Sequence, residues 1–297
     1  PVRQSGQALA RWQARSWANL KTTLGADYIN AENDGSTASG SQLAPGGQTV
    51  GSAAVLSASN FLPTAVKTLG LYVQEEAAIR DKLFLTAGVR TDQNSAFGTN
   101  FQRVYYPTTQ LSWLMSDESF FPRYSWLDQF RLRMAYGAAG VQPGATSSLQ
   151  PYVPSTVNVN GTDTPGLRAD ALGNPNLKPE TSAEFEGGFD TQLLHSRVNL
   201  ELTYYSKQTK NALIQLPIAP NAAPSNTSVL ANIASVKNAG VEATLNTQLI
   251  DIRQFGWDLT INASHNTNKV VSLGTNPGTG KPYPTLAAGT THDSVGL

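Results

Sequence analysis

Cysteine is absent from the 297-residue sequence, which excludes disulfide bonds and thiolate metal sites. Charge is scarce as well: Asp, Glu, Lys and Arg make up 14% of the chain, against about 25% in ordinary soluble domains. The net charge is zero and the pI is about 7.4, so we expect no nucleic-acid partner. No apolar run approaches the roughly eighteen residues that a membrane-spanning helix needs.

Sequence signals for metal and cofactor chemistry are also missing. The three histidines, His195, His265 and His292, have no neighbour at a metal-ligand spacing, so we predict no metal site. Residues 278–281 read Gly-Thr-Gly-Lys, but Pro282 stands where a phosphate-binding loop needs Ser or Thr. We therefore expect no cofactor.

What the sequence does contain is strict alternation of apolar and polar residues. Between residues 182 and 190, for example, Glu184 and Glu186 flank Phe185. Because successive strand side chains point to opposite faces, such a stretch has one polar and one apolar face. Nine strands are predicted, at residues 14–30, 68–79, 83–96, 104–115, 129–139, 181–194, 197–215, 235–250 and 255–271. Strands of this length suit a tilted membrane crossing better than a globular sheet.

The predicted connections fall into two classes that alternate along the chain. Short ones lie at residues 80–82, 194–197 and 251–254, with a longer member at 116–128. Long ones, rich in Gly, Pro, Ser and Asn, lie at residues 31–67, 140–180 and 216–234, with a modest member at 97–103. Short periplasmic turns and long extracellular loops are typical of outer-membrane barrels, where long structureless loops are ordinary. We therefore predict an all-β, transmembrane, antiparallel up-and-down β-barrel.

The polar face of the predicted strands carries charge, which indicates a wide lumen that holds water or a plug rather than packed side chains. The charged residues expected to face the lumen or a plug are Arg90, Asp92, Arg131, Arg133, Glu184, Glu186, Asp190 and Glu201. A plugged lumen needs polar partners of both signs, which explains these carboxylates better than acid–base catalysis does. We expect no enzymatic activity. Gly240 is expected on the same polar face of its predicted strand. Because it has no side chain, it permits either the close approach of a plug or a β-bulge at that position.

The number of predicted strands bears on completeness. Single-chain bacterial barrels have an even number of strands, and nine cannot close one. We therefore expect residues 1–297 to be a partial barrel domain, with strands missing on both sides.

Several motifs occur in an order that resembles a known family. They include Glu-Ser-Phe-Phe-Pro at residues 118–122, Phe-Arg-Leu-Arg-Met-Ala-Tyr-Gly at 130–137 and Gly-Asn-Pro-Asn-Leu-Lys-Pro-Glu at 173–180. Asn-Ala-Gly-Val-Glu follows at 238–242. Together they resemble the barrel of TonB-dependent receptors of the SusC/RagA type, over about residues 67–273.

This resemblance implies a 22-stranded outer-membrane barrel closed by an N-terminal plug, with energy supplied through TonB. It also implies a SusD-like lipoprotein partner, contact with outer-membrane lipids, and uptake of a glycan, oligosaccharide or peptide. The plug, the TonB-contacting segment and the C-terminal strands are not recognisable in these residues.

Loop residues are the candidates for solute contact. Tyr152 could stack on a sugar ring, with Asn158, Asn160 and Asp163 offering hydrogen bonds. Two other functions stay open at this point: a passive porin, or a structural or adhesin-like outer-membrane barrel. A secreted β-sandwich or lectin is a third alternative.

Overall fold

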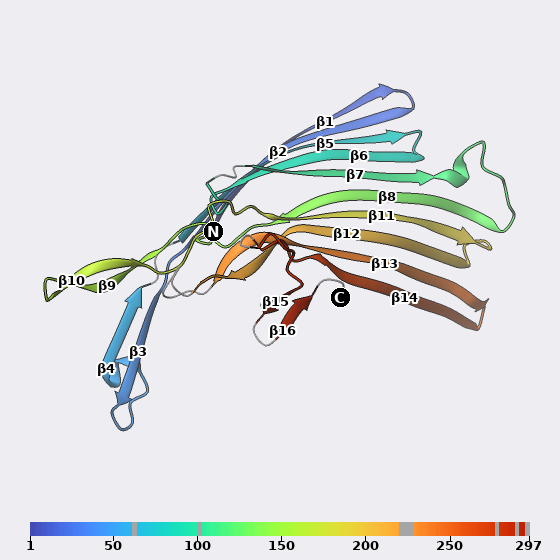
Figure 1. The fold of residues 1–297 in the computed structure, drawn as a ribbon. Coiled ribbons are helices and arrows are strands. Elements are labelled where there is room, and N and C mark those ends of the chain that lie inside the picture. Colours follow the sequence, from blue (N-terminus) through green and yellow to red (C-terminus); the bar gives the residue numbers. More distant parts are fainter. Residues whose placement is uncertain (61–63, 100–102, 220–227, 277–278, 289–290, 295–297) are drawn as a thin grey trace.

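The computed structural model describes residues 1–60, 64–99, 103–219, 228–276, 279–288 and 291–294, and the molecule is built from β-strands. One antiparallel sheet dominates it (Figure 1). Its ten strands, in spatial order, are β1 (Val2–Arg15), β2 (Ala18–Asn33), β5 (Thr64–Ile79), β6 (Leu83–Asn94), β7 (Val104–Leu114), β8 (Leu127–Val141), β11 (Glu180–Leu193), β12 (Val198–Pro217), β13 (Ser228–Ile252) and β14 (Phe255–Ser272). Spatial order follows chain order, which makes this an up-and-down sheet.

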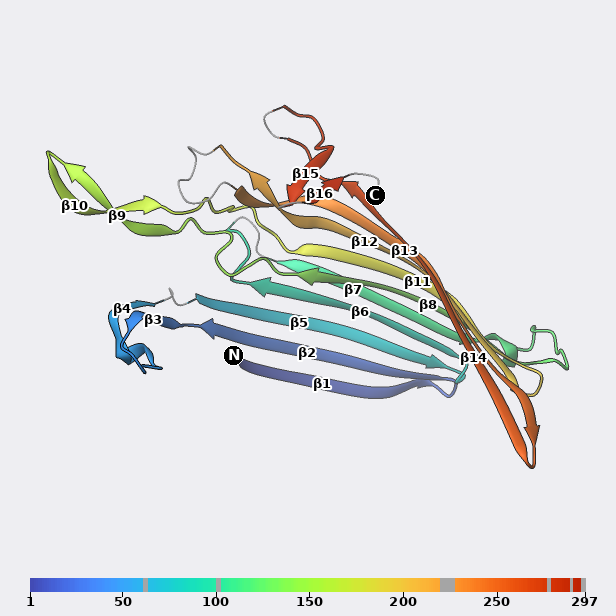
Figure 2. The same cartoon turned by 90° about the horizontal axis from the view of Figure 1, so that it is seen from below.

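The two rims of the sheet differ as the sequence predicted. One rim carries tight turns, such as the one at residues 80–82, where Arg80 and Asp81 adopt positive φ angles. A short 3₁₀ helix, η2 (Met115–Asp117), starts the longer connection on that rim. All the long connections gather at the opposite rim, as both views show (Figures 1 and 2). The predicted segregation of short turns and long loops onto opposite rims is confirmed.

The strand count differs from the prediction, because the structure has ten sheet strands rather than nine. The segment predicted as one strand at 14–30 contains a turn at residues 16–17, and β1 precedes it. The outward residues of β1 include Gln4, Gly6 and Ala8, which provide too little apolar contrast to reveal a strand. Ten is an even number, so the argument from an odd count fails. The described sheet is nonetheless open, since β1 pairs only with β2 and β14 only with β13.

The long extracellular connections were expected to be structureless, and this was wrong. The connection between β2 and β5 holds a hairpin of β3 (Ser36–Leu43) and β4 (Ala53–Asn60), joined through the 3₁₀ helix η1 (Val50–Ser52). The connection between β8 and β11 holds a second hairpin, β9 (Tyr152–Val159) with β10 (Thr162–Ala169). A third hairpin, β15 (Thr285–Ala288) with β16 (Thr291–Ser294), follows β14. The first two project well beyond the sheet (Figure 1).

Strand register assigns every sheet residue to one of two faces, because directly paired residues share a face. Large apolar side chains on one face are well exposed, including Leu71, Met134, Val241 and Ile261. The buried hydrophobic residues are few and include Leu177 and Leu273 on the extracellular side. The sheet therefore has no core of its own on that apolar face. No helix in the described part of the chain is long and apolar enough to cross a membrane.

Candidate functional site

The candidate site is the polar face of the ten-stranded sheet, hereafter the inner face, and the apolar face is the outer face. The register runs Arg133 to Gly188 to Thr203 across three neighbouring strands, which fixes the parity of each strand. By the same parity all eight charged residues expected in the lumen lie on the inner face: Arg90, Asp92, Arg131, Arg133, Glu184, Glu186, Asp190 and Glu201. Whether they meet a plug stays a prediction.

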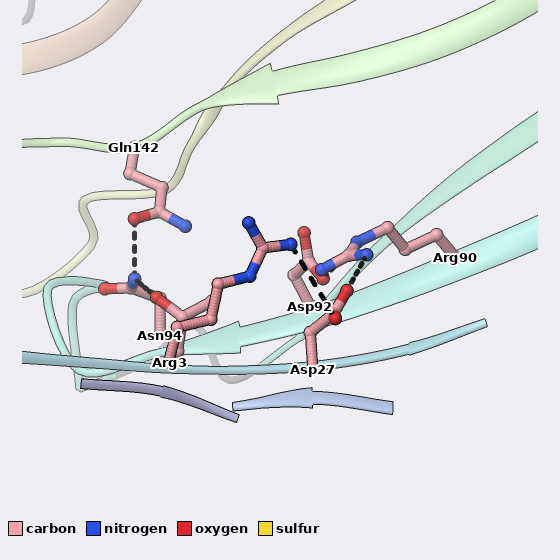
Figure 3. Close-up of polar contacts among 7 residues, drawn as sticks. Arg3, Asp27, Arg90, Asp92, Asn94 and Gln142 are labelled. Carbon is pink, nitrogen blue, oxygen red and sulfur yellow. Dashed lines mark hydrogen bonds and ion pairs between the residues drawn. The ribbon is translucent and has the colours of Figure 1, made fainter. Parts of the chain in front are cut away.

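An ion-pair cluster occupies the inner face of β2 and β6 toward the extracellular rim (Figure 3). Arg90 donates from Nη1 to Oδ2 of Asp27 and from Nε to Oδ1 of Asp92, both at 2.8 Å. Arg3 of β1 approaches Oδ1 of Asp27 at 3.9 Å. Both carboxylate side chains are largely covered, with relative exposures of 13% and 14%, so the two arginines neutralise charges that water reaches poorly.

This cluster lies flat against the wall because glycines stand beside it. A Cβ added to Gly70 would lie 2.1 Å from Nη2 of Arg90, and one added to Gly25 would lie 2.1 Å from Cζ of Tyr72. Long polar side chains thus fold down over glycine backbone instead of projecting from the wall. The hollows on the inner face include two of roughly 650 and 550 Å³. Arg3, Asp27, Tyr72 and Arg90 line the first, and Arg11, Lys21 and Glu76 the second.

Polar contacts continue from the wall to the extracellular connections. Asn94, at the end of β6, donates from its amide to Oγ1 of Thr68 and to Oε1 of Gln142, both at 2.6 Å (Figure 3). Its Oδ1 accepts from the backbone N–H of Ala96 at 2.7 Å. One buried side chain therefore ties the β6–β7 connection to the beginning of the long β8–β11 connection.

A second ion-pair cluster lies on β8, β11 and β12. Arg133 donates to Oδ1 of Asp190 from Nε at 2.8 Å, and its Nη2 lies 2.7 Å from the same oxygen. Nη2 also lies 3.4 Å from Oγ1 of Thr203. Further along, Lys207 lies 3.6 Å from Glu184. The inner face therefore carries paired positive and negative charges on β8, β11 and β12 as well as on β1, β2 and β6.

Three of the predicted lumen residues have no ion pair in the described part of the chain. Arg131 and Glu201 lie directly beside Asp190 in the register, but Arg133 rather than Arg131 pairs with that carboxylate, and Glu201 is itself an anion. Glu186 is exposed on the same face. These side chains are the ones available to a further polar surface.

Sequence reasoning missed Asp27, Arg3 and Lys207, which complete the two clusters. Asp27 lay inside a predicted strand whose start was misplaced, and Arg3 lay in the strand that was not predicted. Alternation gave no signal for Arg3, because outward residues of β1 such as Gln4 and Gly6 are not apolar.

Gly240 was expected to admit a plug or to form a bulge. The ladder runs through Gly240 without interruption, so there is no bulge at this position. An added Cβ would lie 2.8 Å from the Tyr205 ring and 2.6 Å from the His265 carbonyl oxygen. The glycine thus accommodates an aromatic side chain and a neighbouring backbone.

The loop candidates for solute contact lie on the β9–β10 hairpin, but not all together. Asn158 donates to Asp163 at 2.9 Å and accepts from the N–H of Gly161 at 3.0 Å, so its amide builds the turn. Asn160 occupies that turn with a positive φ of 51°. Tyr152 stands at the hairpin base, six residues or about 20 Å away from Asn158. A single sugar ring cannot contact both ends, and the binding role of each residue stays a prediction.

The contacts made by residues 173–180 account for the distinctive sequence of this segment. Leu177 is completely buried, and its carbonyl accepts from the N–H of Gly98 at 2.7 Å. The amide of Asn232 on β13 brackets the backbone of Lys178, donating to its carbonyl at 2.7 Å and accepting from its N–H at 3.0 Å. The segment therefore fastens the base of the long loop to the β6–β7 connection and to strand β13.

Comparison with known proteins identifies the family. The family model described as "TonB dependent receptor-like, beta-barrel" matches residues 3–291. The chain belongs to this family. It is 33% identical over 200 residues to TonB-dependent receptor P26 of Formosa agariphila, covering 66% of this chain and 20% of that protein. It is 25% identical over 205 residues to TonB-dependent receptor SusC of Bacteroides thetaiotaomicron, again covering 66% and 20%.

Solved structures agree with this fold. The RagAB peptide importer in its closed-closed state matches with a TM-score of 0.80 at 20% identity, covering 99% of this chain and 32% of that one. The outer membrane transporter YddB from Escherichia coli matches with a TM-score of 0.60 at 12% identity, covering 99% and 37%. Among its curated relatives, the chain spans only about a fifth to a quarter of their length.

Family membership places the protein in the outer membrane of Gram-negative bacteria and identifies the family as one of receptors and transporters, not enzymes. The outer face of the sheet therefore faces lipid. Among the residues that the structure describes, no group of three or more His, Asp or Glu is arranged to hold a metal ion.

Proposed function

We propose that this chain is part of the barrel wall of a TonB-dependent receptor that takes up a large glycan, oligosaccharide or peptide. Its inner face would border the solute path and would contact a plug domain supplied by the rest of the protein. The chain would perform no catalysis. Energy would come through TonB, which would contact a part of the receptor outside this chain.

The observation that carries this proposal is the inner face itself. It is wide, polar and furnished with both signs of charge, while Arg131, Glu186 and Glu201 remain unpaired there in the described structure. A second polar surface, such as a plug, would satisfy these groups, whereas a small barrel would fill its interior with its own side chains. The family match over residues 3–291 supports the same assignment.

The experiment compares uptake by cells that carry the full-length gene with uptake by cells that lack it, each with and without TonB. Pools of labelled peptides and of labelled oligosaccharides serve as separate probes. We expect one pool to accumulate only when both receptor and TonB are present. Accumulation that persists without TonB would indicate the passive porin instead.

We further propose that the β3–β4 and β9–β10 hairpins contact a SusD-like lipoprotein at the extracellular surface. Both project beyond the sheet, and residues such as Leu56 and Leu167 are more than 60% exposed there. Removing residues 153–168 and bridging the gap with a short Gly/Ser linker should abolish co-purification of the lipoprotein while leaving the barrel folded. Undiminished co-purification would contradict this role for the β9–β10 hairpin.

A further inference from the structure

The outer face of β12, β13 and β14 carries three lysines near its extracellular end, Lys210, Lys237 and Lys269. Lys237 and Lys269 are directly paired in the register of β13 and β14, and Lys210 pairs with Ser235, which places it diagonally to Lys237. Directly opposed Cβ atoms in antiparallel strands lie about 5 Å apart, and diagonal ones about 7–8 Å. All three side chains are exposed, and we call them the lysine cluster.

The lysine cluster has no counter-charge in the described structure. None of the three lysines takes part in an ion pair or side-chain hydrogen bond, and the outer face of β11–β14 carries no carboxylate. Like charges directly opposite each other destabilise a sheet. An anion placed between Lys237 and Lys269 would remove that cost.

The height of the lysine cluster identifies the surroundings from which the anion would come. Each lysine lies twelve positions above an apolar residue near the periplasmic end of its strand: Val198 on β12, Leu249 on β13 and Trp257 on β14. Twelve residues span about 40 Å along a strand, or about 30 Å across the membrane at the usual tilt. The apolar band of such barrels is about 25 Å tall, so the lysine cluster lies at headgroup level.

We propose that the lysine cluster binds the phosphate of an outer-leaflet glycolipid, whose acyl chains lie on the apolar side chains below. Lysine binds phosphate as a compact point charge, and basic clusters at membrane interfaces select anionic headgroups. Tyr204, Val241 and Ile261 lie six, four and eight positions below Lys210, Lys237 and Lys269 on the same outer face, are 41–48% exposed and present an apolar surface to the chains. The lipid is favoured over a transported solute because the lysines are on the opposite face from the solute path.

The test measures lipid retained by the purified full-length receptor, using native mass spectrometry with phosphorylated or dephosphorylated lipid A as the probe. The triple variant K210Q/K237Q/K269Q should bind phosphorylated lipid A about tenfold more weakly or worse, since each lysine contributes to headgroup attraction. The triple Arg variant should retain binding. The matched control is K207Q, on the inner face of the same β12 strand, which should bind like the unaltered protein.

Two results would overturn the proposal: equal retention by the triple Gln variant, or equal binding of dephosphorylated lipid A by the unaltered receptor. Heat-dependent migration in gel electrophoresis checks that each variant is folded. If the triple Gln variant does not fold, K237Q replaces it, and an unchanged affinity of that variant would equally overturn the proposal.

Discussion

The two faces of the ten-stranded sheet differ in which charged side chains they carry and in whether these side chains are paired. On the inner face Arg90, Arg133 and Lys207 each lie within 4 Å of a carboxylate, so both signs are present and most are paired. On the outer face of β12–β14 the charged groups are lysines alone, above an apolar band. The difference matches the family's placement of such sheets, with the apolar face against lipid and the charged face away from it.

Glycine marks the same division in another way. Gly25, Gly70 and Gly188 are on the inner face, and an added Cβ at each would collide with a neighbouring side chain or backbone. They allow long polar side chains to lie along the wall. On the outer face, side chains such as Leu71 and Ile261 instead project into lipid.

The largest effect should come from placing a cation in the apolar band. Val73→Arg puts the charge on the outer face of β5 in mid-membrane and should lower the free energy of unfolding by about 2–4 kcal/mol. Gln74→Arg, one residue along on the inner face, should change it by less than about 0.5 kcal/mol. Denaturant titration of the full-length receptor in lipid vesicles measures both. Equal losses of unfolding free energy in the two variants would contradict the assignment of one face to lipid and the other to water.

A smaller loss is expected where neighbouring backbone leaves no room beside a glycine of the inner face. An alanine Cβ at position 188 would lie 2.3 Å from the carbonyl oxygen of Leu202, so Gly188→Ala should cost about 1–3 kcal/mol. Gly137 is on the same face with nothing within 4 Å of an added Cβ, and Gly137→Ala is the matched control. Thermal unfolding measures the stability of both variants. Equal stability of Gly188→Ala and Gly137→Ala would contradict the claim that backbone leaves no room for a side chain at position 188.

The smallest effect concerns the partly exposed ion pair of the inner face. Arg133 is 38% exposed, so a double-mutant cycle with Asp190 should give a coupling energy of only about 0.5–1 kcal/mol, decreasing with added salt. The cycle of Arg131 with Asp190 should give almost none, since those side chains do not pair. A larger coupling for Arg131 would show that the pairing changes in the complete barrel.

The alternation of residues predicted the central strands well. Strand β6 was expected at 83–96 and lies at Leu83–Asn94, because large apolar residues on one face contrast with polar ones on the other. The hairpin strand β3, with sequence Ser-Thr-Ala-Ser-Gly-Ser-Gln-Leu, lacks such contrast and could not be found. Strand β1 was missed for the same physical reason.

The candidate site was predicted as a face but not as a set of contacts. Parity alone places Arg90 and Asp190 on the inner face. One of the two partners of Arg90 is Asp27, 63 positions earlier in the chain, and this pairing depends on the register of three strands. Register follows from the turns and hairpins between strands; the short turns such as 80–82 were predicted, but the turn at residues 16–17 and the β3–β4 hairpin between β2 and β5 were not.

The central claim is that one face meets lipid and the other does not. The chain has no cysteine, so spin labels can be attached to single cysteines at residues 200–205 of β12, with any cysteine elsewhere in the full-length receptor replaced. In bilayers, labels at 200, 202 and 204 should collide more with oxygen, and labels at 201, 203 and 205 more with a water-soluble nickel chelate. Accessibility without a two-residue period, or with the opposite phase, would contradict the account.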